Sequence, residues 1–322
     1  MKIWLRTTTE TSFSSGIGVV WNSVKNAFDK LGINYTLDDP KEKCIELWIG
    51  WDFDIEPSSN FVIGYTTGET AIEEMKCYEQ VDLWFFPTKY FVDLQSGKYN
   101  IHQWKYGADP VMLPYIYRNW DDVFVFSHVG ATQYRKGTHL ACQAFRNVFG
   151  DSKGVRLDII SHGETEAFWM LQELYECDNI RFIASNIPRE DIKTKYGGNC
   201  LLFPSLREGW GLHLGEAMAT GMPAIVTDYR IFDDQFNSNF GWWIKLSDKK
   251  SKIFKELPDM LDFQAKMVYA VKNRGLAKEK GVVASSWCHK YLTWEYGVLN
   301  GLIPVLEKYG LGKEIFISRD ET

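Results

Sequence analysis

Short apolar runs alternate with amphipathic helical stretches along most of the 322-residue chain. In the helical stretches, apolar side chains recur every three to four positions. The apolar runs are shorter and are bounded by turn residues, which is typical of buried strands. A strand, a helix and a second strand in this order form a parallel β-α-β unit. The alternation therefore predicts an α/β fold built on parallel sheets.

The alternation falls into two series. The first predicts strands at residues 3–5, 45–49, 61–65 and 81–86, a closing segment at 111–115, and helices ending near residue 31 and covering 70–78 and 90–96. The second predicts strands at 123–128, 155–160, 179–184, 199–204 and 223–228, and helices at 138–149, 165–175, just after residue 188, at about 212–221 and from about 258 onward. Two series in a chain of this length predict two Rossmann-like domains, 1–116 and 117–285, followed by a helical tail, 286–322.

Composition excludes several classes of protein. The net charge is −6, so no broad basic surface points to nucleic acid, although a local basic groove stays open. The six cysteines are scattered without a C-x-x-C pair, which favours free thiols in a reducing compartment. The N-terminus, MKIWLRTTTE, has no apolar signal region, and no apolar run has the length of a membrane span. We expect a cytoplasmic protein without a transmembrane segment.

The segment 206–228, LREGWGLHLGEAMATGMPAIVTD, places two acids among glycines where a strand passes into a helix. The strand ends at Pro204 and the helix begins near Leu212. Glu208 therefore lies at the carboxyl end of a parallel strand, where open α/β sheets bind ligands. Free N–H groups at the helix start favour anions, and glycines let the backbone approach a ligand. Glu216 lies about one turn into the helix, where an acid is favoured and can reach hydroxyl groups.

The spacing of the two acids is uninformative alone, because glutamate pairs at any fixed spacing arise by chance. The whole frame is informative: Pro-Ser at 204–205, Glu-Gly-Trp-Gly-Leu at 208–212, and Glu-Ala-Met-Ala-x-Gly-x-Pro at 216–223. It resembles the donor-site signature of retaining glycosyltransferases with the GT-B fold, the large family 4 that also resembles glycogen and sucrose synthases. A second stretch, FVFSHVGATQYRKGTHLACQAF at 124–145, resembles the first strand, cationic turn and helix of that family's donor domain.

The resemblance implies a role for each matching residue. Glu208 would contact the sugar and stabilise an oxocarbenium-like transition state, and Glu216 would hold the ribose hydroxyls. Arg135 and Lys136 would stabilise the charge of the leaving diphosphate. Further donor contacts are implied at Gly209, Trp210, Gly211, Leu212, Gly130 and, near the nucleotide base, Ser185. One departure is Ala131, where the family often has an arginine.

The first domain resembles the family less closely. Gly16 and Gly18 resemble a glycine loop that faces the cleft between domains, although such a pair is equally typical of a helix-capping turn. Many members carry a histidine after a middle strand; the matching segment 65–69 has none, and Glu69 is a candidate replacement. The resemblance implies two parallel sheets facing an inter-domain cleft, with C-terminal helices packing back toward the first domain. Acceptor recognition is not implied by it.

The sequence does not favour a metal site. Asp52-Phe53-Asp54 is a D-x-D triplet, the metal-binding signature of the other major glycosyltransferase fold, but no other part of that fold is present. No histidine or cysteine spacing suits zinc. His213 lies in the first helical turn, where it is either exposed or within reach of phosphate, and the role of His128 is open. We expect no metal and no cofactor apart from the substrate, a UDP- or GDP-linked sugar.

The sequence thus predicts a retaining hexosyl- or pentosyltransferase that moves a sugar from a nucleotide-diphosphate sugar to an acceptor. The acceptor class (glycan, protein, lipid or nucleic acid), the base, the sugar and the oligomeric state stay unassigned. Two alternatives remain open: an epimerase or hydrolase that acts on nucleotide sugars with the same scaffold, and a nucleotide-sugar binding protein without catalytic activity.

Overall fold

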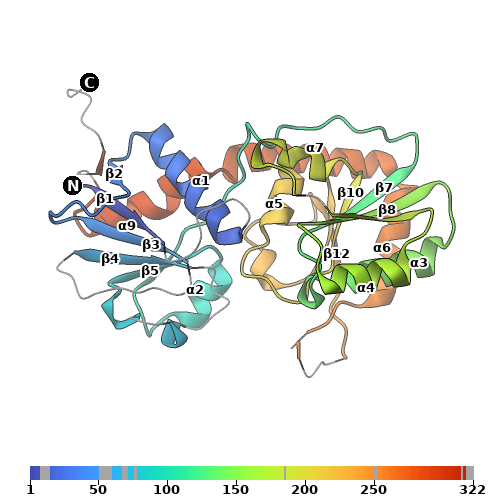
Figure 1. Ribbon diagram of the computed structural model, residues 1–322, viewed down its shortest axis with the longest axis horizontal. Helices are drawn as coiled ribbons and strands as arrows, with labels where there is room; N and C mark the ends of the chain where they lie inside the picture. Colours follow the sequence, from blue (N-terminus) through green and yellow to red (C-terminus); the bar gives the residue numbers. More distant parts are fainter. Residues whose placement is uncertain are drawn as a thin grey trace. The chain divides into compact units, whose positions relative to one another are not determined.

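The chain divides into two compact units. The computed structural model describes residues 1–7, 15–50, 60–66, 72–75, 78–184, 186–249, 253–254, 256–312 and 315–316 (Figure 1). The first unit comprises Met1–Gly107 together with Leu292–Thr322, and the second comprises Ala108–Tyr291. Each contains one six-stranded sheet in which every neighbouring pair of strands is parallel. The predicted class, two Rossmann-like domains with parallel sheets, is confirmed.

The first sheet has the strand order β2-β1-β3-β4-β5-β6. Its strands are β1 (Ile3–Arg6), β2 (Tyr35–Thr36), β3 (Ile45–Ile49), β4 (Phe61–Tyr65), β5 (Leu83–Phe86) and β6 (Ile101–Gln103). The predictions at 45–49 and 61–65 are confirmed to the residue. The prediction that the segment 111–115 closes this series is wrong: it forms turns, and β6 completes the sheet instead. The sequence of β6, Ile-His-Gln, is too short and too polar to be predicted as a strand.

Helices of the first unit come from both ends of the chain. They are α1 (Gly16–Leu31), α2 (Lys89–Gln95), α8 (Trp294–Gly297), a π-helical stretch (Val298–Leu302), α9 (Ile303–Lys308) and the short 3₁₀ turns Ile72–Glu74 and Tyr78–Gln80. The side chain of Ser15 caps α1 by accepting a hydrogen bond from the N–H of Gly18 at 2.9 Å. Helices α1 and α8 pack together, and Trp294 and Leu306 are buried. The predicted return of the C-terminal helices to the first unit is confirmed (Figure 1).

In the first sheet, the side chain of Arg6 lies between the indole rings of Trp4 and Trp48. The guanidinium of Arg6 lies 3.9 Å from the ring centre of Trp4 and 3.8 Å from that of Trp48. It donates at 2.9 Å to the buried carboxylate of Glu46, which also accepts from Trp48 Nε1 and from Asn60 Nδ2. The buried charge is therefore both paired and hydrogen-bonded, as burial of a carboxylate requires.

The second sheet has the order β12-β11-β10-β7-β8-β9. Its strands are β7 (Phe124–Val129), β8 (Val155–Ser161), β9 (Ile180–Ala184), β10 (Cys200–Phe203), β11 (Ala224–Thr227) and β12 (Gly241–Ile244). The sequence did not predict β12, whose burial is interrupted by two partly exposed tryptophans. Helices α3 (Thr138–Phe149), α4 (Glu166–Tyr175), α5 (Leu212–Ala219), α6 (Met260–Lys272) and α7 (Arg274–Tyr291) accompany the sheet, with 3₁₀ turns at Tyr134–Lys136, Arg189–Tyr196 and Arg230–Phe232.

The core of the second unit packs α3 and α6 against one face of this sheet. Phe126 and Leu157 from the strands meet Phe145 from α3 and Met267 from α6, and all four are buried. Because all six strands run in one direction, their carboxyl ends meet at a single edge of the sheet. The segments that leave β7 and β10 at that edge carry the candidate site.

Candidate active site

Glu208 occupies the loop that joins β10 to α5, and its side chain is buried despite its charge, at 5% residue exposure. Its Oε1 atom accepts hydrogen bonds from Lys136 Nζ at 2.5 Å and from Ser205 Oγ at 3.0 Å. Arg135 lies farther away, with Nη1 3.9 Å from Oε2. The acid and both cations singled out from the sequence are therefore brought together, although about seventy residues separate them.

The ionisation of Glu208 is set by two opposing effects. Burial raises the pKa of the Glu208 carboxyl, but the Lys136 ammonium, the more distant Arg135 guanidinium and the hydroxyl of Ser205 lower it further than burial raises it. The net result is a pKa below the ordinary value of a glutamate. Glu208 therefore places a negative charge at the carboxyl edge of the sheet at neutral pH.

Backbone contacts hold the cationic turn against the acidic loop. The N–H of Leu206 donates to the carbonyl of Arg135 at 2.7 Å. Gly137 follows the turn with φ +72°, and a Cβ atom there would overlap the carbonyl oxygen of Pro204. Only glycine fits both the positive φ and this approach. The Arg-Lys-Gly motif at 135–137 and the Pro-Ser motif at 204–205 therefore pack against each other as two neighbouring loops.

Gly211 immediately precedes α5 as its N-cap residue and has a left-handed conformation, with φ +90°. A Cβ atom there would lie 3.2 Å from the rings of Phe203 and Phe232. Trp210 is buried, and its carbonyl accepts a hydrogen bond from the side chain of Gln235. The glycine-tryptophan-glycine sequence therefore has a packing reason within the domain: it turns the chain over two phenyl rings.

Glu216 lies in α5 and is the centre of a second buried network. Arg189 Nη1 donates to its Oε1 atom at 2.5 Å, and the Tyr196 hydroxyl donates to its Oε2 atom at 2.5 Å. His213 Nδ1 is 2.8 Å from the Tyr196 oxygen and 3.2 Å from Glu216 Oε2. Burial raises the pKa of Glu216, but Arg189, His213 and Tyr196 together hold it well below the ordinary value. Both carboxylate oxygens of this acid already have partners within the protein.

Gly130 stands at the end of β7 and faces this network. Its φ is +144°, and a Cβ atom there would lie 3.4 Å from Cδ2 and 3.7 Å from Nε2 of His213. The imidazole ring thus lies between Gly130 and Glu216. The sequence had identified Gly130 and Glu216 as separate contacts; the structure joins them through His213.

Sequence reasoning did not select Arg189, Tyr196 or Gln235. No local motif marks them, and Arg189 is 27 positions from the acid that it binds. The only signal is indirect: Arg189 begins the 3₁₀ turn that leads toward β10, so its direction depends on the tertiary fold. His213 had been noted as exposed or near phosphate, and its contact with Glu216 follows from the i, i+3 spacing in one helix.

Two further buried side chains hold the scaffold. His128 lies in β7, where Nδ1 donates to the carbonyl of Leu202 at 2.9 Å and Nε2 is 3.0 Å from Thr138 Oγ1. Burial lowers the pKa of His128 to about 4. The side chain of Arg118 donates to backbone carbonyls of Gly198, Ile116, Thr220 and Tyr196 and to the Thr220 hydroxyl. Both residues therefore tie loops and strands of the second unit together.

The remaining predicted residues lie in a helix of the first unit or outside the described residues. Gly16 and Gly18 lie in the first turn of α1, capped by Ser15. Ser185, Glu69 and the D-x-D triplet at 52–54 fall outside the described residues. Within the described part of the chain, no three His, Cys, Asp or Glu side chains gather as metal ligands would, and no helix has the length and apolarity needed to span a membrane.

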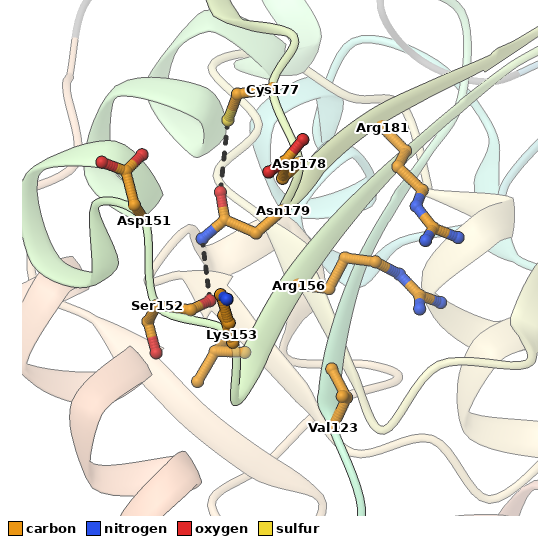
Figure 2. Close-up of a pocket in the computed structure, with 10 residues that line it drawn as sticks. Val123, Asp151, Ser152, Lys153, Arg156, Cys177, Asp178, Asn179 and Arg181 are labelled. Carbon is orange, nitrogen blue, oxygen red and sulfur yellow. Dashed lines mark hydrogen bonds between the residues drawn. The ribbon is translucent and has the colours of Figure 1, made fainter.

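A surface cavity of about 610 Å³ lies at the opposite edge of the second sheet (Figure 2). It is lined by residues at the amino ends of β7, β8 and β9: Val123, Asp151, Ser152, Lys153, Val155, Arg156, Cys177, Asp178, Asn179 and Arg181. Figure 2 shows Arg156 and Arg181 extending in the same direction from neighbouring strands. Arg156 is held by Asp158 through two hydrogen bonds of 2.8 and 2.9 Å. None of the predicted site residues lines this cavity.

Comparison with known proteins agrees with the fold and with the motifs. Residues 118–273 match the family model described as Glycosyl transferases group 1. No match was found among curated proteins. Among solved structures, sucrose-phosphate synthase from Thermosynechococcus elongatus superposes with a TM-score of 0.64 at 13% identity, covering 83% of this chain and 73% of that one.

Two other solved structures cover the chain to a similar extent. TarM superposes with a TM-score of 0.62 at 16% identity over 84% of this chain and 55% of its own. The pneumococcal O-GlcNAc transferase GtfA, in complex with UDP and GlcNAc, gives 0.62 at 14% identity over 82% and 56%. The chain thus spans little more than half the length of these two proteins. The predicted GT-B fold and the predicted resemblance to the group 1 glycosyltransferases are confirmed.

Proposed function

We propose that this GT-B chain, whose residues 118–273 match the group 1 glycosyltransferases, transfers a sugar from a nucleotide-diphosphate sugar to an acceptor and retains the anomeric configuration. One observation supports this above the others: a buried, ionised Glu208 pairs with Lys136 at the carboxyl edge of the second sheet. A pair of opposite charges at this edge suits a donor that carries a negative diphosphate next to a sugar that becomes positive during transfer.

The cations act on the leaving group in this mechanism. Lys136 Nζ has three N–H donors, and one of them is used by Glu208. The other two N–H groups of Lys136 can bind a diphosphate oxygen, and Arg135, which lies in the same 3₁₀ turn, provides a second cation. As the bond between the anomeric carbon and the phosphate oxygen breaks, negative charge accumulates on the diphosphate and these cations stabilise it. The N–H groups from Gly209 to Leu212 complete the anion site.

Glu208 acts on the sugar in this mechanism. Its carboxylate faces the positive charge that develops at the anomeric carbon, and it does not form a covalent bond. The acceptor oxygen attacks from the side that the diphosphate leaves, and the leaving phosphate takes the acceptor proton. The anomeric configuration is therefore retained. An ionised carboxylate is needed throughout, which agrees with the lowered pKa of Glu208.

The remaining assignments of the site are proposals of the same kind. Trp210, Gly130 and Ser185 contribute to the donor pocket, and Gly16, Gly18 and Glu69 to the acceptor side. The donor is UDP- or GDP-linked; the solved structure of GtfA, a protein of similar fold, contains UDP. Transfer proceeds without a metal or cofactor, in the cytoplasm, with a hexose or a pentose as the transferred group.

A panel of nucleotide sugars tests the proposal. The wild-type chain is heated with UDP- and GDP-linked hexoses and pentoses, since a ligand at a hundred times its Kd adds about 2.7 kcal/mol to stability. Nucleotide release is then followed with candidate acceptors, and the anomer of the product is read by NMR. Free sugar or an epimer as the only product would favour the hydrolase or epimerase reading. Tight binding without turnover on any acceptor would favour the binding protein.

A further inference from the structure

The cavity at the amino ends of β7, β8 and β9 has a hydrogen-bonded floor. Asn179 is only 6% exposed, and its side-chain amide donates to the carbonyl oxygens of Gly150 and Ser152 at 2.7 and 3.1 Å. Its Oδ1 atom accepts a hydrogen bond from the thiol of Cys177 at 3.2 Å (Figure 2). These bonds join the turn before β8 to the turn before β9, so two walls of the cavity are held together. The volume of about 610 Å³ lies in the range of small-molecule sites.

The two arginines of this cavity lie on one face of the second sheet. Asp158 of β8 is directly opposite Arg181 of β9 in the strand register, and Arg156 precedes Asp158 by two positions on the same face. Asp158 is 8% exposed and accepts hydrogen bonds from Nε and Nη2 of Arg156. A nearly buried carboxylate therefore fixes the Arg156 guanidinium. Two of its five N–H groups are used in this way, which leaves three for another acceptor.

Charges of both signs line the cavity without pairing with one another. Among the described residues, the side chains of Lys153 and Arg181 have no hydrogen-bond or ion-pair partner. The same holds, within the described residues, for the carboxylates of Asp151 and Asp178. Figure 2 shows the guanidinium groups of Arg156 and Arg181 on one side of the cavity and Asp151 on the other. One side therefore presents hydrogen-bond donors, and another presents acceptors.

A phosphate group fits the arginine side of the cavity. Phosphate oxygens accept charge-assisted hydrogen bonds from guanidinium groups. A phosphomonoester has three terminal oxygens, one more than a carboxylate, so it can bind Arg156 and Arg181 together. Hydroxyl groups fit the side of Asp151 and Asp178, because an ionised carboxylate can only accept hydrogen bonds.

We propose that this cavity binds a small phosphomonoester that carries hydroxyl groups, as a phosphorylated sugar does. Its phosphate lies between Arg156 and Arg181, and its hydroxyl groups face Asp151 and Asp178. The cavity lies at the opposite edge of the sheet from Glu208, and none of the proposed donor contacts lines it. The inference therefore does not depend on the proposed function, and binding in this cavity should not compete with binding of a nucleotide.

Four small probes test which groups of the ligand are recognised. Calorimetry measures the Kd of the wild-type chain for ribose 5-phosphate, inorganic phosphate, ribose and gluconate. We expect ribose 5-phosphate to bind at least roughly tenfold more tightly than inorganic phosphate or ribose, because it alone of the three supplies both a phosphate and hydroxyl groups. Gluconate carries a carboxylate in place of the phosphate and should also bind more weakly. Saturating UDP should leave the Kd of ribose 5-phosphate unchanged.

Three substitutions test the two sides of the cavity. Arg181→Gln removes one guanidinium and should weaken binding of ribose 5-phosphate by roughly tenfold or more. The matched control is Lys278→Gln, which removes the same charge from an exposed position of α7 outside the cavity. It should bind within about twofold of wild type. Asp151→Ala should weaken binding of ribose 5-phosphate by roughly threefold or more without weakening that of inorganic phosphate.

The inference is overturned when wild type shows no saturable binding of ribose 5-phosphate up to about 10 mM, or when Arg181→Gln binds it as Lys278→Gln does. Gluconate bound as tightly as ribose 5-phosphate rejects the phosphate, and competition with UDP rejects the location. Should Arg181→Gln fail to fold, Lys153→Gln replaces it in the same comparison. Failure of the proposed function is a separate result, in which UDP and GDP do not bind while the binding of ribose 5-phosphate still depends on Arg181.

Discussion

Lys136 Nζ lies 2.5 Å from Glu208 Oε1, across 72 positions of sequence, and the lysine side chain is only 15% exposed. One contact therefore joins the cation proposed to stabilise the diphosphate with the acid proposed to stabilise the sugar. The pair serves stability before any ligand binds, because an unpartnered carboxylate would be costly at this depth. Stability and catalysis can be separated by substituting each member in turn.

Lys136→Met should lower both stability and activity. Loss of the ammonium leaves a buried carboxylate with Ser205 and the more distant Arg135, so we expect a loss of about 2 kcal/mol in the free energy of unfolding. The double variant Lys136→Met/Glu208→Gln should recover about 1–2 kcal/mol of that loss without recovering turnover. Urea unfolding of the two single variants and the double variant measures the coupling, and additive losses would show that the pair contributes nothing.

Glu208→Gln should separate binding from chemistry. The amide keeps the shape of the side chain and frees Lys136 for the diphosphate, so donor Kd should change by less than about fivefold. Without the negative charge, kcat should fall by roughly 100- to 1000-fold. Calorimetry measures the Kd of the donor, and single-turnover nucleotide release measures the rate of the chemical step. Retention of most of kcat would remove Glu208 from the transition state while leaving the fold assignment intact.

Gly211→Ala should destabilise the second unit. The residue has φ +90°, and the added Cβ would press on the rings of Phe203 and Phe232 at 3.2 Å. We expect a loss of about 2 kcal/mol or more in the free energy of unfolding. Gly16→Ala is the matched control, because its Cβ would meet nothing within 4 Å at the start of α1. Equal stability of the two variants would show that the left-handed turn is not required.

His128 should make stability fall as the pH falls. Its pKa is about 4 in the folded chain and about 6.5 when unfolded, so the unfolded state binds more protons between these values. The contribution of His128 to the free energy of unfolding is therefore largest above pH 6.5 and decreases as the pH falls toward 4. The loss between pH 7 and pH 5 should be about 2 kcal/mol for this group. Urea unfolding across this range should show a shallower pH dependence in His128→Asn, and an unchanged dependence would assign the titration elsewhere.

The sequence predicted the parts of this chain whose signals are local. Strands β3 and β4 are short apolar runs with turn residues on either side, and helix α3 follows directly from a glycine and an apolar period. The contact between Lys136 and Glu208 could be anticipated only because parallel strands bring their carboxyl ends to one edge, and because both motifs resembled one family.

Features that depend on packing could not be predicted in the same way. Strand β12 has no periodic pattern to distinguish it, and β6 is too short and polar. Two partners of Glu216, Arg189 and Tyr196, come from a 3₁₀ turn that only the folded chain brings near α5. The sequence related the glycines of this turn to a ligand, but it could not show that a Cβ at Gly211 would also press on the rings of Phe203 and Phe232.

The division of the chain has a consequence for synthesis. Ala108–Tyr291 is one continuous segment, while the first unit is built from Met1–Gly107 and Leu292–Thr322. Trp294, Leu302 and Leu306 are buried residues of that last segment, so the first unit lacks part of its core until they leave the ribosome. We therefore expect the usual order, in which the N-terminal domain is completed first during translation, to be reversed. The second unit can fold as soon as its own continuous segment has been synthesised, whereas the first unit cannot complete its core until Leu292–Thr322 has been added.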